Sequence, residues 1–220
     1  MRSRSNLLRA LGLAGLAAAC AAPRMPDGSG RGLLSHDRTP PDGVETFQAP
    51  RWQNGDRLVY LRGDALRLTT HVEVTEAGYD LVDEATGERQ ALTTTLGDRG
   101  ELAPDPRGGQ PRPVIEQAPA DERYHWPLWV GKRWSCHFLR KAPGQPPLPL
   151  LVTYVVEDVD EVTVPAGTFR ALRIVRRANV AAEGTYLGRV AVSWYAPEAG
   201  VEVRRIDDGV LTELAELHRQ

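Results

Sequence analysis

Ten residues from Leu66 to Thr75 alternate between two kinds of side chain. The first set is mostly apolar and consists of Leu66, Leu68, Thr70, Val72 and Val74. The second set is polar and reads Arg67, Thr69, His71, Glu73 and Thr75. Because successive side chains of a β-strand point to opposite faces, this pattern predicts a long strand with one buried face and one solvent-exposed face.

Further strand-like segments follow along the rest of the chain, most of them alternating and one, 150–156, apolar on both faces. Strands are predicted at 89–96, 133–140, 150–156, 170–176, 186–194 and 201–206. The segment 210–217 reads as a final strand or as a short helix, since Leu211, Leu214 and Ala215 also fit helical spacing. With 21 Gly and 17 Pro to make turns between them, these segments predict an all-β fold.

Two features of the β-rich region leave alternatives open. Residues 98–120 carry five prolines and are predicted to form a long loop, which could be a lid, a partner-binding segment or a joint. The glycine-led segments 55–60 and 87–92 resemble 131–136 and 167–172 at similar offsets. Either the domain contains two similar β halves, or strands that follow a glycine simply look alike.

The first twenty residues predict export and lipid attachment. Arg2, Arg4 and Arg9 precede a short apolar stretch at 10–19, too short to span a bilayer, and Cys20 follows three alanines. This resembles the bacterial lipobox, in which the cysteine is lipidated after cleavage. The alternative is an ordinary secretory peptide cut after an A-x-A site, with Cys20 incidental.

The chain is therefore divided into three parts. Residues 1–19 are the signal peptide, 20–50 hold the lipidated (palmitoylated) Cys20 and a Pro/Gly-rich flexible tether, and 51–220 form a β-rich periplasmic domain. Ala21 is not the Asp that resembles an inner-membrane retention signal. We expect the protein to be held by its lipid on the outer membrane of the cell envelope, facing the periplasm.

Charge and motifs exclude several classes of function. The 27 Lys+Arg and 29 Asp+Glu residues nearly balance, so no basic field would attract nucleic acid. The motifs G-x-S-x-G, H-E-x-x-H and S-x-x-K do not occur, and we expect no catalytic residues, metal or cofactor. Cys136 and His137 would face opposite sides of a strand, which predicts an inert buried thiol.

A basic stripe on the segment 170–177 has two interpretations. Its members are Arg170, Arg173, Arg176 and Arg177. The first interpretation is a solvent-exposed strand face that pairs with the acidic residues at 157–161. The second is a site for an anion or a lipid headgroup.

Three segments of the second half resemble a known family. They are Pro127–Trp134 (PLWVGKRW), Val164–Leu172 (VPAGTFRAL) and Trp194–Val201 (WYAPEAGV). In this order they resemble the TapB-like group of secreted bacterial proteins, over roughly residues 51–217. The resemblance implies a curved antiparallel sheet or half-barrel, and it brings no catalytic residues.

A curved sheet exposes a concave apolar face unless something fills it. We expect the concave face to include Leu68, Val72, Trp134, Phe138, Val192 and Trp194. The sequence thus predicts a non-catalytic lipoprotein that binds an apolar ligand, such as lipid, or an envelope protein on this face. The alternative is a structural or assembly lipoprotein that acts through loops and sheet edges.

Overall fold

The computed structural model describes residues 33–35, 39–63, 66–182 and 185–220 of the chain. The predicted signal peptide (1–19) and Cys20 lie outside the described residues, as do residues 21–32 and 36–38 of the predicted tether. Cleavage and lipidation therefore stay predictions.

Regular structure in the described residues is entirely β, so the predicted all-β fold is confirmed. The strands are β1 (Leu33–Ser35), β2 (Arg57–Arg62), β3 (Leu66–Thr75), β4 (Gly78–Asp83), β5 (Arg89–Leu92), β6 (Asp98–Ala103), β7 (Arg112–Asp121), β8 (Arg133–Lys141), β9 (Leu148–Val164), β10 (Gly167–Ala182), β11 (Thr185–Ala196), β12 (Val201–Asp207) and β13 (Val210–His218). The final segment, for which a helix was the alternative, is the strand β13.

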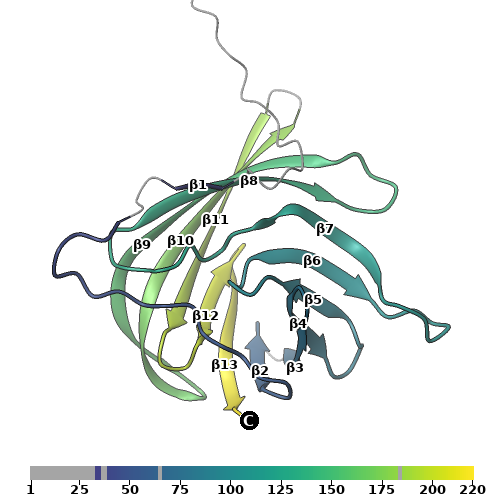
Figure 1. The fold of residues 1–220 in the computed structure, drawn as a ribbon, viewed down its shortest axis with the longest axis horizontal. Helices are drawn as coiled ribbons and strands as arrows, with labels where there is room; N and C mark the ends of the chain where they lie inside the picture. The colour runs from purple at the N-terminus through teal and green to yellow at the C-terminus, as the bar shows by residue number, and fades with distance from the viewer. Residues whose placement is uncertain (1–32, 36–38, 64–65, 183–184) are drawn as a thin grey trace, which may run out of the picture.

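The strands β2 to β13 close into one antiparallel barrel in which each strand pairs with the next one along the chain (Figure 1). The ring closes where β13 pairs with β2, with Leu214 opposite Tyr60. The short strand β1 lies beside β8, next to the part of β8 that β7 does not reach. The sheet is thus curved, as expected, and it closes fully rather than stopping at a half-barrel.

Irregularities in the strands bend the sheet into this closed shape. The register shifts at Arg173/Ile174, at Trp194/Tyr195 and between Leu214 and Glu216. Such bulges increase the local twist and bend a strand, which a closing sheet requires. β9 and β10, with 17 and 16 residues, form the longest hairpin of the barrel.

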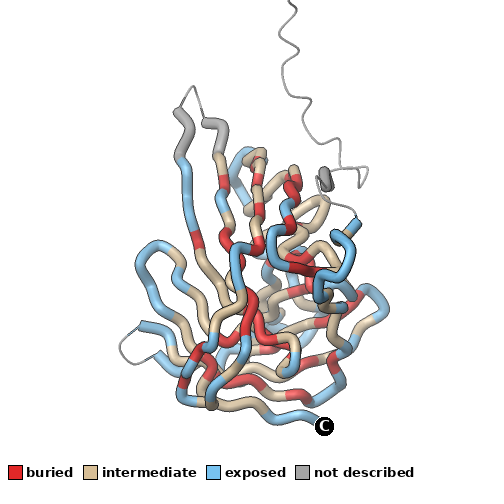
Figure 2. The backbone as a smooth tube through the Cα atoms, turned by 90° about the vertical axis from the view of Figure 1, so that its left-hand side faces the viewer, coloured by how far each residue is buried: buried red, intermediate tan, exposed pale blue. Residues whose placement is uncertain are grey.

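The core fills part of the barrel interior. Trp134 and Tyr154, opposite each other on β8 and β9, stack with ring centroids 5.0 Å apart and planes at 12°. Both are almost fully buried, and Figure 2 shows buried positions alternating with less buried ones along the strands. Burying one such ring contributes about 4–6 kcal/mol of transfer free energy at most.

The segment 98–120, predicted to be a loop, contains β6 and β7 instead. Its prolines are tolerated because this hairpin is irregular, with register shifts at Asp98/Gly100 and Glu101/Leu102. Gly100 has a φ of 119°, and a Cβ there would lie 2.1 Å from the Ile115 carbonyl oxygen. The prediction of a loop was therefore wrong for both strands.

The glycine-led segments that resemble one another, 55–60 and 87–92 with 131–136 and 167–172, all begin at turns. Gly55, Gly87, Gly131 and Gly167 all have positive φ, between 71° and 136°. Each precedes a strand or, for Gly167, begins one, so the shared feature is a turn glycine with positive φ. The described strands form one continuous sheet, which is compatible with either of the two interpretations.

The described part of the predicted tether contacts the barrel. Residues 33–35 pair with β8, and Phe47 exchanges two backbone hydrogen bonds of 2.8 Å with Leu128. Glu45 forms an ion pair with Arg170. Three-residue strands and single bridges have no periodic pattern, which is why the sequence did not reveal them.

Candidate functional site

Two adjoining cavities lie inside the barrel. The first, of about 380 Å³, is lined by Arg123, Arg140, Arg176, Arg189 and Arg205, and we call it the arginine cavity. The second, of about 330 Å³, is lined by Leu58, Leu68, Leu81, Leu92 and Leu96, and we call it the leucine cavity. Arg123, Tyr124, Glu202, Arg205 and Asp207 line both. Each volume is within the range of small-molecule sites.

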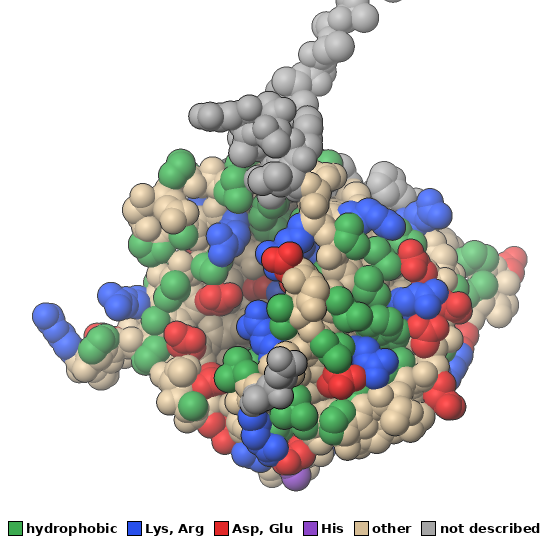
Figure 3. Space-filling model, turned by 180° about the vertical axis from the view of Figure 1, so that it is seen from behind, with side chains coloured by type: hydrophobic (Ala, Val, Ile, Leu, Met, Phe, Trp, Pro, Cys, Tyr) green, Lys and Arg blue, Asp and Glu red, His purple; other side chains and the backbone are tan. Residues whose placement is uncertain are grey.

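The walls of the arginine cavity are mixed in character. Its apolar lining residues are Phe138, Leu148, Leu150, Ile174, Ala178 and Ala191. Its carboxylates are Asp121, Glu202 and Asp207. The view from behind the molecule shows basic, acidic and apolar side chains interspersed around a hollow (Figure 3). The interior is therefore more polar than the apolar concave face that the sequence predicted.

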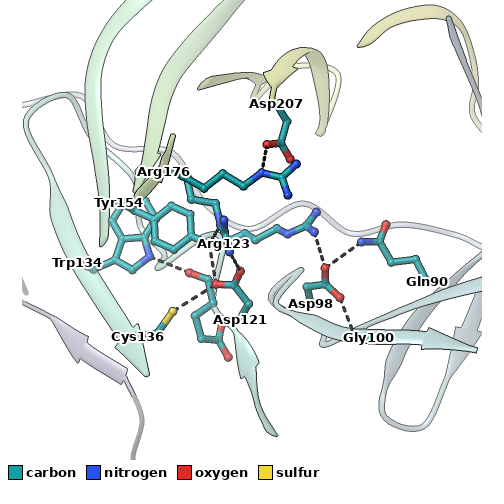
Figure 4. A network of polar contacts seen from close by, with 12 residues as sticks. Gln90, Asp98, Gly100, Asp121, Arg123, Trp134, Cys136, Tyr154, Arg176 and Asp207 are labelled. Atoms are coloured by element: carbon teal, nitrogen blue, oxygen red, sulfur yellow. Dashed lines mark hydrogen bonds and ion pairs between the residues drawn. The ribbon is translucent and has the colours of Figure 1, made fainter. Parts of the chain in front are cut away.

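Asp121 is the centre of a buried polar network (Figure 4). Its Oδ1 accepts a hydrogen bond of 2.6 Å from the Tyr154 hydroxyl and one of 3.3 Å from the Cys136 thiol. Its Oδ2 accepts a hydrogen bond of 2.9 Å from Arg176 Nη2, and Arg176 Nε donates to the Tyr154 oxygen at 3.0 Å. The Trp134 ring stacks on the Tyr154 ring of this network. This network fixes the floor of the arginine cavity.

Burial decides the protonation of the donors in this network. Burial, and then the charge of Asp121, raise the pKa of the Cys136 thiol and of the Tyr154 hydroxyl. Both groups therefore stay protonated at neutral pH and serve as hydrogen-bond donors. A neutral thiol is a poor nucleophile, which agrees with the inert Cys136 that the sequence predicted.

A second network surrounds Asp98 at the start of β6. Asp98 accepts hydrogen bonds from Arg123, from Gln90 Nε2 at 3.1 Å and from the Gly100 backbone at 2.8 Å. Burial lowers the pKa of Arg123, but Asp98 and Asp121 raise it by more. Arg123 thus stays charged where the two cavities meet.

The other arginines of the cavity differ in their partners. Arg189 Nε donates to Asp207 Oδ1 at 2.9 Å, and Arg205 pairs with Glu202 at 2.8 Å. Arg140 makes no side-chain hydrogen bond or ion pair within the described part of the chain. Gln117, directly opposite Arg140 on β7, also lines the cavity.

The leucine cavity carries three tyrosines among its apolar walls. The Tyr60 hydroxyl donates to the Glu202 carbonyl oxygen at 2.9 Å. The Tyr195 hydroxyl is buried and has no hydrogen-bond partner in the described residues. Burial raises the pKa of both, so both remain protonated donors.

The structure places four of the six predicted ligand-binding residues toward the barrel interior. Leu68 lines the leucine cavity and Phe138 lines the arginine cavity. Val72 and Trp134 belong to the buried core beside them. Whether any of the four binds a ligand stays a prediction.

Val192 and Trp194 lie on the opposite face of β11. Ala191 and Ser193 line the arginine cavity, so the alternating neighbours point outward. Trp194 Nε1 donates to Asp160 Oδ2 at 2.8 Å, and the Arg204 guanidinium lies 5.8 Å from the Trp194 ring centroid. The expectation that both residues share the concave face is corrected: β11 carries apolar side chains on both faces, and the sequence alone favoured the larger ones.

The basic stripe divides between the two faces of β10. Arg176 enters the interior, whereas Arg173 pairs outside with Asp160 at 3.2 Å and Glu157 at 3.5 Å. The interpretation as a solvent-exposed face that pairs with the acidic residues at 157–161 therefore holds for Arg173. The charged residues of the cavities other than Arg176 were missed, because binary patterning places charges outside.

Two further observations concern metals and membrane spans. Within residues 33–35, 39–63, 66–182 and 185–220, no group of three His, Cys, Asp or Glu side chains is placed to hold a metal ion. The same residues include no helix of the length and apolarity needed to cross a membrane.

Comparisons with known proteins give distant structural likenesses. No family model matches the chain, and no curated protein matches its sequence. A protein of Parabacteroides distasonis that is described as a lipoprotein is 13% identical, with a TM-score of 0.45 over 79% of this chain and 99% of its own. The hypothetical lipoprotein YmcC from Escherichia coli is 7% identical, with a TM-score of 0.48 over 77% and 89%.

A third likeness is to a protein of Bacteroides fragilis that is described as exported and as having a YmcC-like fold. It is 12% identical, with a TM-score of 0.40 over 80% of this chain and all of its own. The descriptions of these three proteins name no enzymatic activity. At these values the likenesses carry no argument about function, and the resemblance to the TapB-like group stays a prediction.

Proposed function

We propose that this protein is a non-catalytic binding protein of the cell envelope that takes a small amphipathic ligand into its barrel. The observation that carries the proposal is the pair of adjoining cavities, of about 380 and 330 Å³, whose walls combine apolar side chains with ordered polar groups. Sites for small molecules combine mostly apolar walls with a few well-placed polar groups. The predicted lipid anchor at Cys20 would hold such a protein beside the membrane.

The charged interior supports binding over a purely structural role. Buried ion pairs contribute little net stability, and apolar residues of similar volume often serve folding equally well. Here Asp121 and Asp98 each hold an arginine at the cavity wall. Such groups are more useful for orienting a ligand than for stabilising the barrel.

The outer surface gives the alternative function its own support. Val192, Ile206 and Leu211 lie side by side across β11, β12 and β13 on the outward face. Ile206 and Leu211 are each 40% exposed. A structural or assembly lipoprotein could contact an envelope partner through this row.

A cavity-filling variant tests the proposal. In Ala191→Phe, a ring is placed into the arginine cavity, and in the matched control Val190→Phe it is placed on the outer face of the same strand. The full chain would be titrated with the neutral fluorophore N-phenylnaphthylamine. We expect Ala191→Phe to weaken binding about tenfold or more, equivalent to about 1.4 kcal/mol, and Val190→Phe to leave it unchanged.

Thermal unfolding of both variants must accompany the titration, because overpacking costs about 1–3 kcal/mol where no space exists. Equal affinity in Ala191→Phe and wild type, with both folded, would contradict binding in the barrel. If Val190→Phe alone disrupted a complex with an envelope protein, the outer face of β11 would become the functional surface.

A further inference from the structure

We infer that the ligand of the arginine cavity is an amphipathic acid with one negative charge, whose acidic group pairs with Arg140. This inference rests on the proposed function and names the class of ligand for the same site. It depends on a charge imbalance between the cavity arginines and their carboxylate partners, and on the position of one arginine.

Four of the five cavity arginines are held by a carboxylate of the protein. Their pairs are Arg123–Asp98, Arg176–Asp121, Arg189–Asp207 and Arg205–Glu202. Arg140 is the fifth, and no carboxylate of the described residues pairs with it. Asp98 lies behind the lining, and with it four carboxylates face five arginines. One positive charge therefore stays unbalanced, and a ligand with one negative charge would neutralise it.

Arg140 lies at one end of the cavity rather than at its floor. It is the last cavity residue of β8, it pairs with Leu148 on β9, and Gln117 is directly opposite on β7. Its guanidinium presents donors in a planar fork that fits a carboxylate with two parallel hydrogen bonds. The side chain of Gln117 also has no hydrogen-bond partner in the described residues, so its amide is available as a further donor.

Apolar side chains continue inward from Arg140. Phe138 precedes it on the same face of β8, and Leu150 follows Leu148 on β9. Ile174 and Ala191 extend this surface across the cavity. An acid bound at Arg140 would thus lay its apolar chain along these residues, toward the leucine cavity.

The same arrangement disfavours other head groups. A cation would face Arg140 without a free carboxylate, because Asp121, Glu202 and Asp207 are already engaged. A neutral alcohol would bury the same apolar area but would leave the Arg140 charge unpaired. An unpaired charged donor that is partly buried costs free energy, so the acid is preferred.

The test measures three probes of equal chain length on the full chain, purified without detergent. The probes are dodecanoic acid, dodecanol and dodecylamine, each competing with N-phenylnaphthylamine. We expect the acid to bind wild type about tenfold more tightly than the alcohol, with the amine weakest. The variant Arg140→Gln should lose this preference and bind acid and alcohol alike.

The matched control is Arg177→Gln on β10. Arg177 is exposed and next in sequence to the inward-facing Arg176, so its loss changes the net charge equally without touching the cavity. Its affinity for the acid should remain that of wild type. An equal loss in both variants would show a general charge effect and would overturn the inference.

Other outcomes separate this inference from the proposed function. If wild type binds alcohol as tightly as acid, or if Arg140→Gln keeps full affinity for the acid, the inference is wrong although the barrel binds ligands. If no probe displaces the fluorophore and Ala191→Phe changes nothing, both proposals are wrong.

Discussion

Arg173 and Arg176 lie three positions apart on one strand, yet they belong to different environments. Arg176 reaches into the barrel and donates a 2.9 Å hydrogen bond to Asp121, whose side chain is 2% exposed. Arg173 lies outside among Glu157, Asp158 and Asp160, all of which are more exposed. The sequence shows the same residue type in both places, and only the register decides what each one does.

The difference lies in what happens when a partner is lost. An exposed arginine that loses a carboxylate is solvated by water, so exposed ion pairs contribute about 0–1 kcal/mol. Water replaces the partner poorly in a buried ion pair, so removal of one partner there costs about 3–5 kcal/mol. Substitutions on the two faces of β8 to β10 should therefore differ greatly in effect.

The largest expected effect is that of Trp134→Ala. Its ring stacks on Tyr154, and its Nε1 donates to the Glu122 carbonyl oxygen at 2.8 Å, so the change removes packing and a hydrogen bond together. We expect a loss of about 5 kcal/mol, the upper end for a large buried aromatic. Denaturant unfolding followed by circular dichroism measures this. An unchanged midpoint would show that Trp134 is not part of the core.

The next effect is that of Asp121→Asn, which tests the inner ion pair directly. The amide keeps an acceptor for Tyr154 but leaves the Arg176 charge without a counter-charge. We expect a loss of about 3 kcal/mol in the free energy of unfolding. The double variant Asp121→Leu/Arg176→Met should recover part of this loss. Failure to recover any would mean that the geometry of Asp121, rather than its charge, stabilises the barrel.

The all-β class and several strand faces could be predicted from the sequence. Trp134, Cys136 and Phe138 were placed on one buried face by alternation, and the structure agrees. Alternation reports local periodicity, and local periodicity is what makes an individual strand. It carries no information about the pairing of β13 with β2, which joins residues about 150 positions apart and closes the barrel.

The candidate site was less predictable than the fold. Leu68 and Phe138 were found because they are apolar and alternate. Asp98 and Asp121 flank a segment that its prolines made look like a loop, so the hairpin that places them inside was missed. Arg140 and Arg189 were missed because charges are expected on solvent-exposed faces, whereas these two arginines line a cavity inside the barrel.

Asp56 is a third buried carboxylate, and it differs from Asp98 and Asp121 because it has no part in the cavity networks. Asp56 is 1% exposed but lines neither cavity, and it accepts hydrogen bonds from Arg219 Nη1 at 2.6 Å and from the backbone of Gln53 and Gln220 at 3.0 Å. Burial raises its pKa, but these donors lower it by more, so the pKa in the folded protein lies below the usual value. The resulting stability is fully present above the unfolded pKa of about 3.9.

This contribution should be lost as the pH falls through the lower, folded pKa of Asp56. In Asp56→Asn we expect a loss of about 1.5–3 kcal/mol at pH 7, and a smaller difference from wild type in acid. Unfolding curves at pH 7 and in acid measure both values. A difference that grows as the pH falls would contradict the sign argued here. Ligand binding should be unchanged, because the residue lies outside both cavities.

The smallest effect should come from the outer face, with Asp160→Asn. Its amide oxygen can still accept the hydrogen bond from Trp194 Nε1, so the change removes mainly the charge opposite Arg173. Arg173 keeps Glu157 and Asp158 within 4 Å as alternative partners, and water reaches all three carboxylates. We expect a loss below about 1 kcal/mol, which should shrink further at high salt because exposed charges are screened. A loss as large as that of Asp121→Asn, independent of salt, would show that the two faces of the strand do not differ as the exposure of their carboxylates implies.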